Sequence, residues 1–368
     1  MQSELIYQLA LTRVSNIGCI HAKTLVQHFG SASAIFRAPK SSLEKIEGIG
    51  TVRANNIKQY SSFNEDENEI AFIRKFGIQP LFITDPKYPQ RLIHHCYDAP
   101  VLLFYRGTAN LNSSKMIAVV GTRNNSDYGR AFTEKLIKDL VQHEVVIVSG
   151  LAFGIDAVAH KAALRNNLST IGVVGHGLDY IYPANHTVLA KEMVKQNGGI
   201  LTEFRSGTKP DKHNFPGRNR IVAGLTDATV VVETGIKGGS MITAELANGY
   251  NRDVFALPGR TTDHKSEGCN QLIKTNKAVL LTDSAQLIDL MGWGEKPIIA
   301  RKQQKIIFEN LSEHEKIVLK ILQDCESVHI DEIMLRAKVN GSAIAAAILN
   351  LEIENIVRGL PGKRYSLT

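Results

Sequence analysis

Short apolar runs recur between residues 116 and 283, and segments with helical periodicity separate most of them. The runs are Ile117–Val120, Val145–Val148, Ile171–Val174, Ile200–Leu201, Thr229–Val232, Val254–Leu257 and Val279–Leu281. Continuous apolar runs of this length are typical of strands that are buried on both faces of a sheet. Their alternation with helices predicts βαβ units, and hence an α/β fold with an extended Rossmann-like, doubly wound parallel sheet.

The pattern is different on the N-terminal side of this region. Residues 1–110 open with helical periodicity and contain two short segments, Ser15–Gly18 and Ile46–Gly50, each of which leads into a helix. The second segment, followed by Arg53, resembles the turn of a helix-hairpin-helix module, in which glycine amides face a phosphate. A glycine turn that only caps a helix explains the same residues. We therefore expect a helical N-terminal domain (SAM/helix-hairpin-helix-like) over residues 1–110.

The C-terminal end has a third pattern. Helical periodicity covers residues 313–323, 329–337 and 341–352, and a hairpin follows at Ile356–Leu367 around Pro361-Gly362. Three helices and a short hairpin are the outline of a winged helix. Ser312 and Glu315 have the spacing of a capping box at the start of the first helix. The expected division is thus a sheet domain over 111–294, a charged linker over 295–310 and a winged helix over 311–368.

Composition narrows the class of protein only a little. The 368 residues include 43% hydrophobic residues and carry a net charge of +7, which permits a polyanionic partner without requiring one. The four cysteines are far apart and form no Cys-x-x-Cys pair, which argues against zinc sites and a disulfide framework and fits the reducing cytoplasm. Neither a signal peptide nor a membrane-spanning run is evident.

Glycine-rich turns follow several of the predicted strands and supply the candidate chemistry. Strand-edge glycines let backbone amides approach a phosphate, and a following helix N-terminus adds partial positive charge. Carboxyl ends of parallel strands meet at one edge, where open α/β sheets bind ligands. The segment from Lys212 to Arg220 combines cations with an aromatic ring, which suits single-stranded nucleic acid. The candidate residues are Gly121, Arg123, Ser149, Gly150, Lys212, Phe215, Arg218, Asn219, Arg220, Gly238, Gly239 and Ser240.

The order of these motifs and their amino-acid sequences resemble the core of the DNA-processing protein A (DprA/Smf) family over about 170 residues. The matching segments are Val119–Arg123, Asp127–Gly129, Ser149–His160, Gly177–Asp179, Tyr182-Pro183 with Asn185, Phe215–Leu225, Gly239–Ala244 and Val254–Gly259. The helical N-terminus and the winged helix also resemble the family's arrangement. One departure is Gly238, where many relatives have serine; it removes a hydroxyl from that turn and leaves the amides.

The resemblance implies a function. Members of the family bind single-stranded DNA, dimerise, protect incoming strands and load the RecA recombinase during natural transformation (competence). The resemblance implies that the family's DNA-contacting arginine corresponds to Arg123 and its pocket lysine to Lys212. Phe215, Arg218 and Asn219 belong to the same pocket motif, although Arg218 or Arg220 could be structural. We expect a homodimer with RecA as partner, and single-strand-binding protein as a further one. No cofactor, no metal and no catalytic activity are expected.

Two other readings compete with this one. Glu245, after the Gly238–Ser240 turn, could act with Arg218 as in Rossmann-type nucleotide-cleaving enzymes of the phosphoribohydrolase type. The winged helix could act in transcription regulation, but its candidate recognition helix, Ser342–Asn355, offers no lysine or arginine to DNA. Asp156 and His160, four residues apart on a helix, are interpreted as a structural pair rather than a catalytic dyad.

Overall fold

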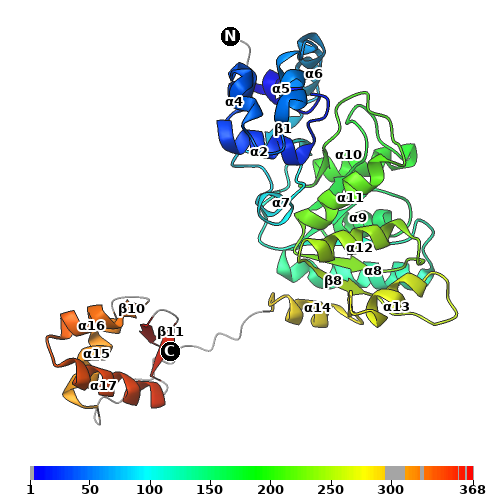
Figure 1. Cartoon of the computed structure of the whole chain (residues 1–368). Coiled ribbons are helices and arrows are strands. Elements are labelled where there is room, and N and C mark those ends of the chain that lie inside the picture. Colours follow the sequence, from blue (N-terminus) through cyan, green and yellow to red (C-terminus); the bar gives the residue numbers. More distant parts are fainter. Residues whose placement is uncertain (1–3, 295–310, 324–326, 355, 361–362, 368) are drawn as a thin grey trace. The chain divides into compact units, whose positions relative to one another are not determined.

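The computed structural model describes all residues except 1–3, 295–310, 324–326, 355, 361–362 and 368. The predicted linker at 295–310 therefore lies outside the described residues. The chain divides into two compact units, Met1–Gly294 and Glu295–Thr368, and each is described by itself (Figure 1).

A nine-stranded sheet forms the centre of the first unit, in the order β1-β2-β6-β5-β4-β3-β7-β8-β9. All of the strands predicted between residues 116 and 283 are present and are parallel to their neighbours within this block. The strands are β3 Met116–Val120, β4 Val146–Ser149, β5 Thr170–Val173, β6 Gly199–Thr202, β7 Ala228–Val231, β8 Asp253–Ala256 and β9 Val279–Leu280. The predicted Rossmann-like fold class is confirmed.

Two further strands lie in the segment that was predicted to be helical. Strand β1 (Gln79–Phe82) pairs with β2 (Leu102–Gly107), and β2 pairs with β6, both in antiparallel fashion. The sheet thus begins at Gln79, and the predicted boundary at residue 110 is wrong. Strand β1 has only four residues and contains a proline, which sheets tolerate at an edge strand. Only the short helix Gln90–His95 lies between β1 and β2, and no helix lies between β2 and β3, so the helical spacing that identified the other strands is weak here.

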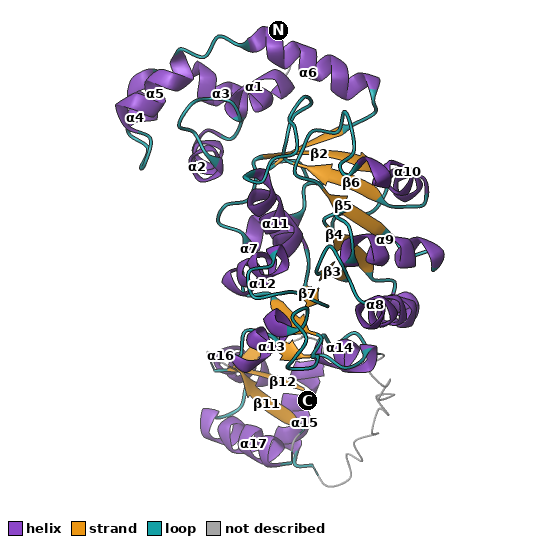
Figure 2. Ribbon diagram, turned by 90° about the vertical axis from the view of Figure 1, so that its right-hand side faces the viewer, coloured by secondary structure: helices purple, strands orange, loops and turns teal. Residues whose placement is uncertain are grey.

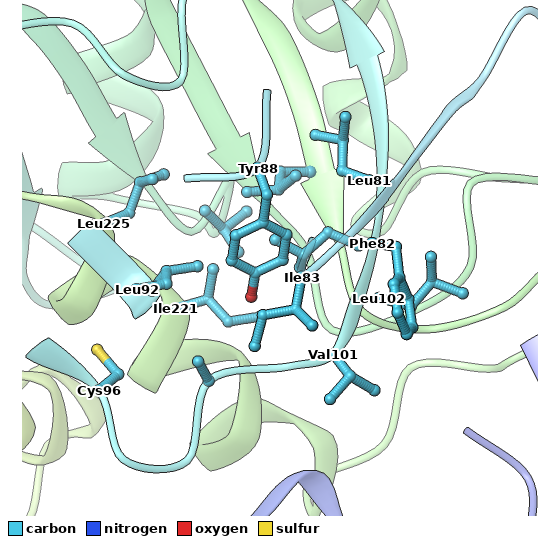
Figure 3. Close-up of a cluster of buried hydrophobic side chains, with 14 of the residues drawn as sticks. Leu81, Phe82, Ile83, Tyr88, Leu92, Cys96, Val101, Leu102, Ile221 and Leu225 are labelled. Carbon is cyan, nitrogen blue, oxygen red and sulfur yellow. The ribbon is translucent and has the colours of Figure 1, made fainter. Parts of the chain in front are cut away.

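Packing explains why these two strands belong to the sheet. Figure 3 shows Tyr88 surrounded by side chains from β1, β2, α7 (Gln90–His95) and α11 (Asn214–Leu225). The Tyr88 ring is fully buried, and its hydroxyl donates a hydrogen bond to the carbonyl oxygen of Pro100. Ile221 and Leu225 reach this cluster from α11. The same core therefore supports the antiparallel edge and the helix that carries the candidate site residues.

Helices cover both faces of the sheet (Figure 2). On one face lie α8 (Asp127–Asp139), α9 (Ile155–Arg165) and α10 (Thr187–Lys195), and on the other lie α7, α11 and α12 (Gly239–Gly249). Short 3-10 turns occupy Leu140–His143 and Ala184–His186, and α13 (Glu267–Lys274) and α14 (Ser284–Leu290) complete the unit near β9. Since both faces are covered, strands β3 to β7 are buried at every position, which agrees with the continuous apolar runs seen in the sequence.

The N-terminal part is helical as far as Lys75. Its helices are α1 Glu4–Leu11, α2 Cys19–Phe29, α3 Ala32–Arg37, α4 Lys40–Glu44, α5 Gly50–Lys58 and α6 Phe63–Lys75. The two turns noted in the sequence precede α2 and α5, and Arg53 links them by donating to the carbonyl oxygens of Asn16 and Gly48, each at 2.9 Å. This arginine therefore holds one turn against the other.

The second unit has the predicted winged-helix elements. Helices α15 (Glu313–Gln323), α16 (Ile330–Ala337) and α17 (Gly341–Ile353) pack around an apolar core, and β11 (Val357–Leu360) pairs with β12 (Arg364–Leu367). A short strand that was not predicted, β10 (Val328–His329), pairs with the other side of β12. The capping box is confirmed, because the Ser312 amide donates to Glu315 Oε2 at 2.7 Å and the Glu315 amide donates to Ser312 Oγ at 3.3 Å.

The strand order reverses beside β3. Successive strands β4, β5 and β6 are added on one side of β3, whereas β7, β8 and β9 are added on the other. The connections that leave β3 and β7 therefore diverge to opposite faces of the sheet and leave a crevice at its carboxyl edge. Open α/β sheets bind their ligands at such a reversal point.

Candidate nucleic-acid interface

A cavity of about 310 Å³ lies in this crevice. Its walls come from the loops that follow β3, β4 and β7 and from the first turns of α11 and α12. The cavity brings together most of the predicted site residues, namely Gly121, Arg123, Gly150, Phe215, Arg218, Asn219, Gly238, Gly239 and Ser240. Turns that are more than a hundred residues apart in the chain thus form one surface.

Arg123 and Arg218 both approach the ring of Phe215. The guanidinium carbon lies 5.4 Å from the ring centroid for Arg123 and 5.9 Å for Arg218, within the range of cation–π attraction. Arg123 is exposed, and within the described part of the chain no hydrogen bond or ion pair holds its side chain. Its five donors therefore remain available to a ligand that also reaches the aromatic ring.

Arg218 has a mainly structural role at the back of the cavity. Its side chain is buried and donates hydrogen bonds to the carbonyl oxygens of Gly150 and, at 2.6 Å, Val173. A side chain at position 150 would collide with the guanidinium, so the close approach requires glycine there. Arg218 thus ties the loop after β4 and the end of β5 to α11.

Asp156 supplies the compensating negative charge. Its Oδ2 accepts hydrogen bonds from the amides of Gly150 and Ala152 at 3.1 and 3.3 Å, at the start of α9. Burial raises the pKa of the Asp156 carboxyl, and the positive charge of Arg218 opposes that shift. The carboxylate and the guanidinium therefore stabilise the glycine-rich loop from both sides.

Gly154 fixes the shape of this loop. Its φ of +78° with ψ of −129° lies in a region that side chains other than hydrogen rarely adopt, and a Cβ atom would collide with the carbonyl oxygen of Thr122. The amide of Ile155 donates to that same oxygen at 3.2 Å. The loop after β4 is therefore packed directly on the segment that carries Arg123.

The N-terminus of α12 forms the opposite wall. Gly238 is its N-cap residue and provides no side-chain hydrogen bond to the first turn. Ser240 is only 7% exposed, lines the cavity, and its hydroxyl has no hydrogen-bond partner among the described residues. An unpaired hydroxyl beside free helix amides is a suitable environment for a phosphate oxygen.

Asn219 and Lys212 occupy different positions around the cavity. Asn219 lines it, accepts a hydrogen bond from Arg218 Nε at 3.0 Å and donates to the carbonyl oxygen of Gly239 at 3.3 Å. Its amide thereby connects α11 to the turn before α12. Lys212 is exposed in the loop before α11 and is not part of the cavity wall.

Two more of the predicted site residues lie outside the cavity. Ser149 is fully buried, and its hydroxyl donates to the carbonyl oxygen of Val119 at 2.6 Å inside the sheet. Arg220 pairs with Glu203 and donates to the carbonyl oxygen of Asp98, so it lies away from the cavity. Residues two apart on a helix point in different directions, which is why Arg218 and Arg220 do not share a site.

The interpretation of Asp156 and His160 as a pair is also wrong. His160 Nδ1 lies 2.7 Å from Thr170 Oγ1, while Asp156 contacts the loop amides. Burial lowers the pKa of His160 to about 3, so the imidazole is neutral in the core. Each residue is structural, but with its own partners.

The nucleotide-cleaving alternative required Glu245 beside Arg218. In the structure Glu245 is exposed and lies 3.5 Å from Lys277 Nζ, outside the cavity wall. Since Arg218 is buried at the back of the cavity, the structure does not bring the two residues together.

Several wall residues were missed from the sequence. Thr234 and Thr243 line the cavity, and Asp156 reaches it from α9. A smaller adjoining cavity of about 30 Å³ shares Arg123, Phe215 and Arg218 and adds His176 and Tyr182. These residues follow strand ends or begin helices, but isolated hydroxyls and rings at such positions carry no distinctive spacing.

Neither a metal-binding cluster nor a membrane-spanning helix occurs among the described residues. Over the described ranges, no group of three or more His, Cys, Asp or Glu side chains could hold a metal ion. None of the helices in the part of the chain that the structure covers has the length and apolar character of a membrane span. Cys19, Cys96 and Cys269 are free thiols, and Cys325 lies outside the described residues.

Comparison with known proteins agrees with the geometry. The family described as DNA recombination-mediator protein A matches residues 79–292, and the DprA winged helix domain matches residues 309–363. Protein Smf of Synechocystis sp. is 33% identical over 99% of this chain and 98% of its own length. The DNA processing protein DprA of Streptococcus pneumoniae is 45% identical over 58% of this chain and 75% of its length.

Solved structures of DNA processing protein A are also similar to this chain. The X-ray structure of DNA processing protein A from Streptococcus pneumoniae has a TM-score of 0.66 at 35% identity and covers 78% of this chain and 98% of that chain. DNA processing protein A from Helicobacter pylori has a TM-score of 0.53 at 32% identity and covers 59% of this chain and 96% of that chain. The family match at 79–292 begins at the first strand of the sheet and ends after its last helix. The chain belongs to the DprA/Smf family of DNA recombination mediators.

Proposed function

We propose that this chain binds single-stranded DNA in the crevice between the β3 and β7 connections and delivers it to RecA. In this role it protects incoming strands and loads the recombinase during natural transformation. The family assignment supports the mediator role, and the relative from Helicobacter pylori has a described single-stranded DNA binding mode. The cavity supplies the combination of cations, ring and free amides that such a ligand needs.

One observation carries the proposal: the free Arg123 guanidinium lies over Phe215, in the same cavity that is lined by Ser240 with its unpaired hydroxyl. An unstacked base can stack on the aromatic ring while the arginine and the α12 amides hold phosphate oxygens. In a duplex the bases are stacked on one another and cannot reach the ring. The arrangement therefore favours single strands.

The remaining parts of the proposal concern partners and chemistry. The sequence has neither a Walker phosphate loop nor a Gly-x-Gly-x-x-Gly fingerprint, so loading proceeds through protein contacts without ATP hydrolysis by this chain. We propose that it is not an enzyme, that it acts as a homodimer in the cytoplasm, and that it works on DNA covered by single-strand-binding protein.

The mediator role has a direct test. The full chain should stimulate RecA filament formation on DNA already covered by single-strand-binding protein, and Arg123→Ala should lose that stimulation because it no longer holds the strand. Filament assembly can be followed by RecA-dependent strand exchange. If the wild type only inhibits RecA at every ratio tested, the mediator role is refuted.

Ser240→Ala separates ligand binding from stability. The substitution removes a buried hydroxyl that has no hydrogen-bond partner among the described residues. We therefore expect the free energy of unfolding to stay within about 0.5 kcal/mol of the wild-type value or to rise. Affinity for single strands should fall by about 1 kcal/mol, since the phosphate loses one hydrogen bond. A melting curve and an anisotropy titration measure the two effects. Equal affinity of the variant and the wild type would remove Ser240 from the contact.

The winged helix should contribute little to strand binding. Residues 311–368 carry a net charge of −1, and α17 has no lysine or arginine. Truncation after Asn310 should therefore leave most single-strand affinity in place, as measured by the same titration. If the isolated C-terminal segment bound DNA as tightly as the whole chain, the assignment of the site to the crevice would be wrong.

A further inference from the structure

We propose that the groove between α8 and α9 is a second segment of the DNA path, which holds phosphates of the strand after it leaves the crevice. The inference rests on the proposed single-strand binding and extends it to residues outside the crevice. It assigns Arg130, Lys161 and Arg165, three cations that no motif in the sequence identified.

The groove is a cavity of about 280 Å³ on the surface of the two helices. Helix α8 contributes Arg130 and Glu134, and α9 contributes Lys161 and Arg165 from successive turns of one face. The two helices lie side by side on the same face of the sheet in Figure 2. A pair of residues four apart on a helix are surface neighbours at about 6 Å, so Lys161 and Arg165 form a short row of positive charge.

This groove is continuous with the crevice. Phe153 lines both the groove and the small cavity that contains Phe215 and Arg123. The next residue, Gly154, also lines the groove and is packed against the backbone of Thr122 and Arg123. A strand that passes Arg123 therefore meets Phe153 first and then the cations of α8 and α9.

The charges in the groove are available to a ligand. Arg130 and Lys161 are exposed, and neither has a hydrogen-bond or ion-pair partner within the described ranges. Arg165 lies 3.2 Å from Glu134, but the two side chains are 67% and 43% exposed. An ion pair this exposed contributes at most about 1 kcal/mol, so a phosphate can replace the carboxylate at little cost.

Phe153 supplies the second element of a single-strand site. The residue is 44% exposed, and its ring makes an edge contact with His186, with the ring centroids 5.0 Å apart. A partly exposed ring fixed by a neighbour is a stacking surface for an unpaired base. The succession of a ring and then a row of cations suits a single strand better than a duplex, which offers phosphates but no free base face.

Binding as a function of strand length tests the inference. Oligothymidylates of about 5 and about 20 nucleotides lie near the lower end and above the upper end of the usual range of single-strand site sizes, ~4–16. The variant Arg130→Gln/Lys161→Gln/Arg165→Gln should bind the short strand as wild type does, because that strand fills only the crevice. It should bind the long strand roughly tenfold or more weakly, and the salt slope for the long strand should fall by about 2, since three contacts are lost at ~0.7 each.

The control variant Lys191→Gln/Lys195→Gln/Lys274→Gln removes the same charge from exposed positions that line none of these cavities. It should retain the long-strand slope to within about 0.5. If the groove variant behaves like this control while Arg123→Ala weakens both lengths, the groove is not part of the path and the crevice assignment stands. If only duplex binding is lost, the groove serves duplex DNA and the inference is overturned. If Arg123→Ala binds both lengths normally, the proposed function itself fails.

Discussion

Arg123→Ala is expected to weaken single-strand binding by about 2 kcal/mol, or ~30-fold, without unfolding the protein. The side chain lies over Phe215 at the cavity, is exposed, and has no hydrogen bond to the rest of the described chain. Its removal therefore costs a phosphate contact and part of the stacking surface but little folding energy. An anisotropy titration at several salt concentrations should show the salt slope reduced by about 0.7.

Lys212→Ala provides a companion measurement at the edge of the site. Lys212 is exposed and outside the cavity wall, so we expect a smaller loss of affinity and a similar reduction of the slope, by about 0.7. Lys274→Ala, an exposed lysine on α13, is the matched control and should change neither quantity. Unchanged affinity and slope in both Arg123→Ala and Lys212→Ala would refute the proposed site.

Arg218→Ala should have the largest effect on stability, with a loss of about 3–5 kcal/mol in the free energy of unfolding. The substitution leaves the buried Asp156 carboxyl without a compensating charge and frees the carbonyl oxygens of Gly150 and Val173. Lysine at 218 should not restore stability, because an ammonium cannot reproduce the planar fork of donors. Denaturant unfolding followed by circular dichroism measures the effect.

A double-mutant cycle identifies the cause of this loss. If Asp156 and Arg218 stabilise each other, Arg218→Met/Asp156→Asn should lose less stability than the sum of the two single variants. Strict additivity, or an Arg218→Ala variant as stable as wild type, would show that the buried pair does not hold the loop. Arg123→Ala should remain as stable as wild type in the same assay, which separates the binding arginine from the structural one.

The central sheet was predictable because its parallel strands are buried on both faces and are separated by helices. Each predicted strand, from Ile117–Val120 to Val279–Leu281, is present within a residue or two. Strands β1 and β2 were not predictable in this way, because they join the sheet through the antiparallel pairing of β2 with β6, which lies about a hundred residues further along the chain. A contact between distant segments produces no periodic pattern of apolar residues in the local sequence.

The site was predictable at the level of loops but not of side chains. Glycine turns at strand ends located the crevice, since parallel strands bring those ends to one edge. Ser149 and Arg220 occur in the same motifs, yet neither lines the cavity. The Ser149 hydroxyl donates a hydrogen bond inside the sheet, and the Arg220 side chain leaves α11 in another direction and pairs with Glu203. Which side of a helix faces the cavity follows from the packing of α11 on the sheet, and a motif does not specify that packing.

The groove cations were missed for a related reason. Arg130 and Lys161 are separated by a strand and a loop in the sequence and become neighbours only when α8 and α9 pack together. In the sequence each is an ordinary solvent-facing charge on a helix, and the net charge of the region is small. Their combined field exists only in the folded chain.

The most direct test of the central claim compares the two forms of DNA. The full chain should be titrated with a single-stranded oligonucleotide and with the duplex of the same sequence, each at two salt concentrations. The account predicts tighter binding to the single strand at both concentrations and a slope of about −0.7 for every phosphate that the chain contacts. Equal or tighter binding to the duplex would contradict the claim that the crevice between β3 and β7 selects unpaired DNA.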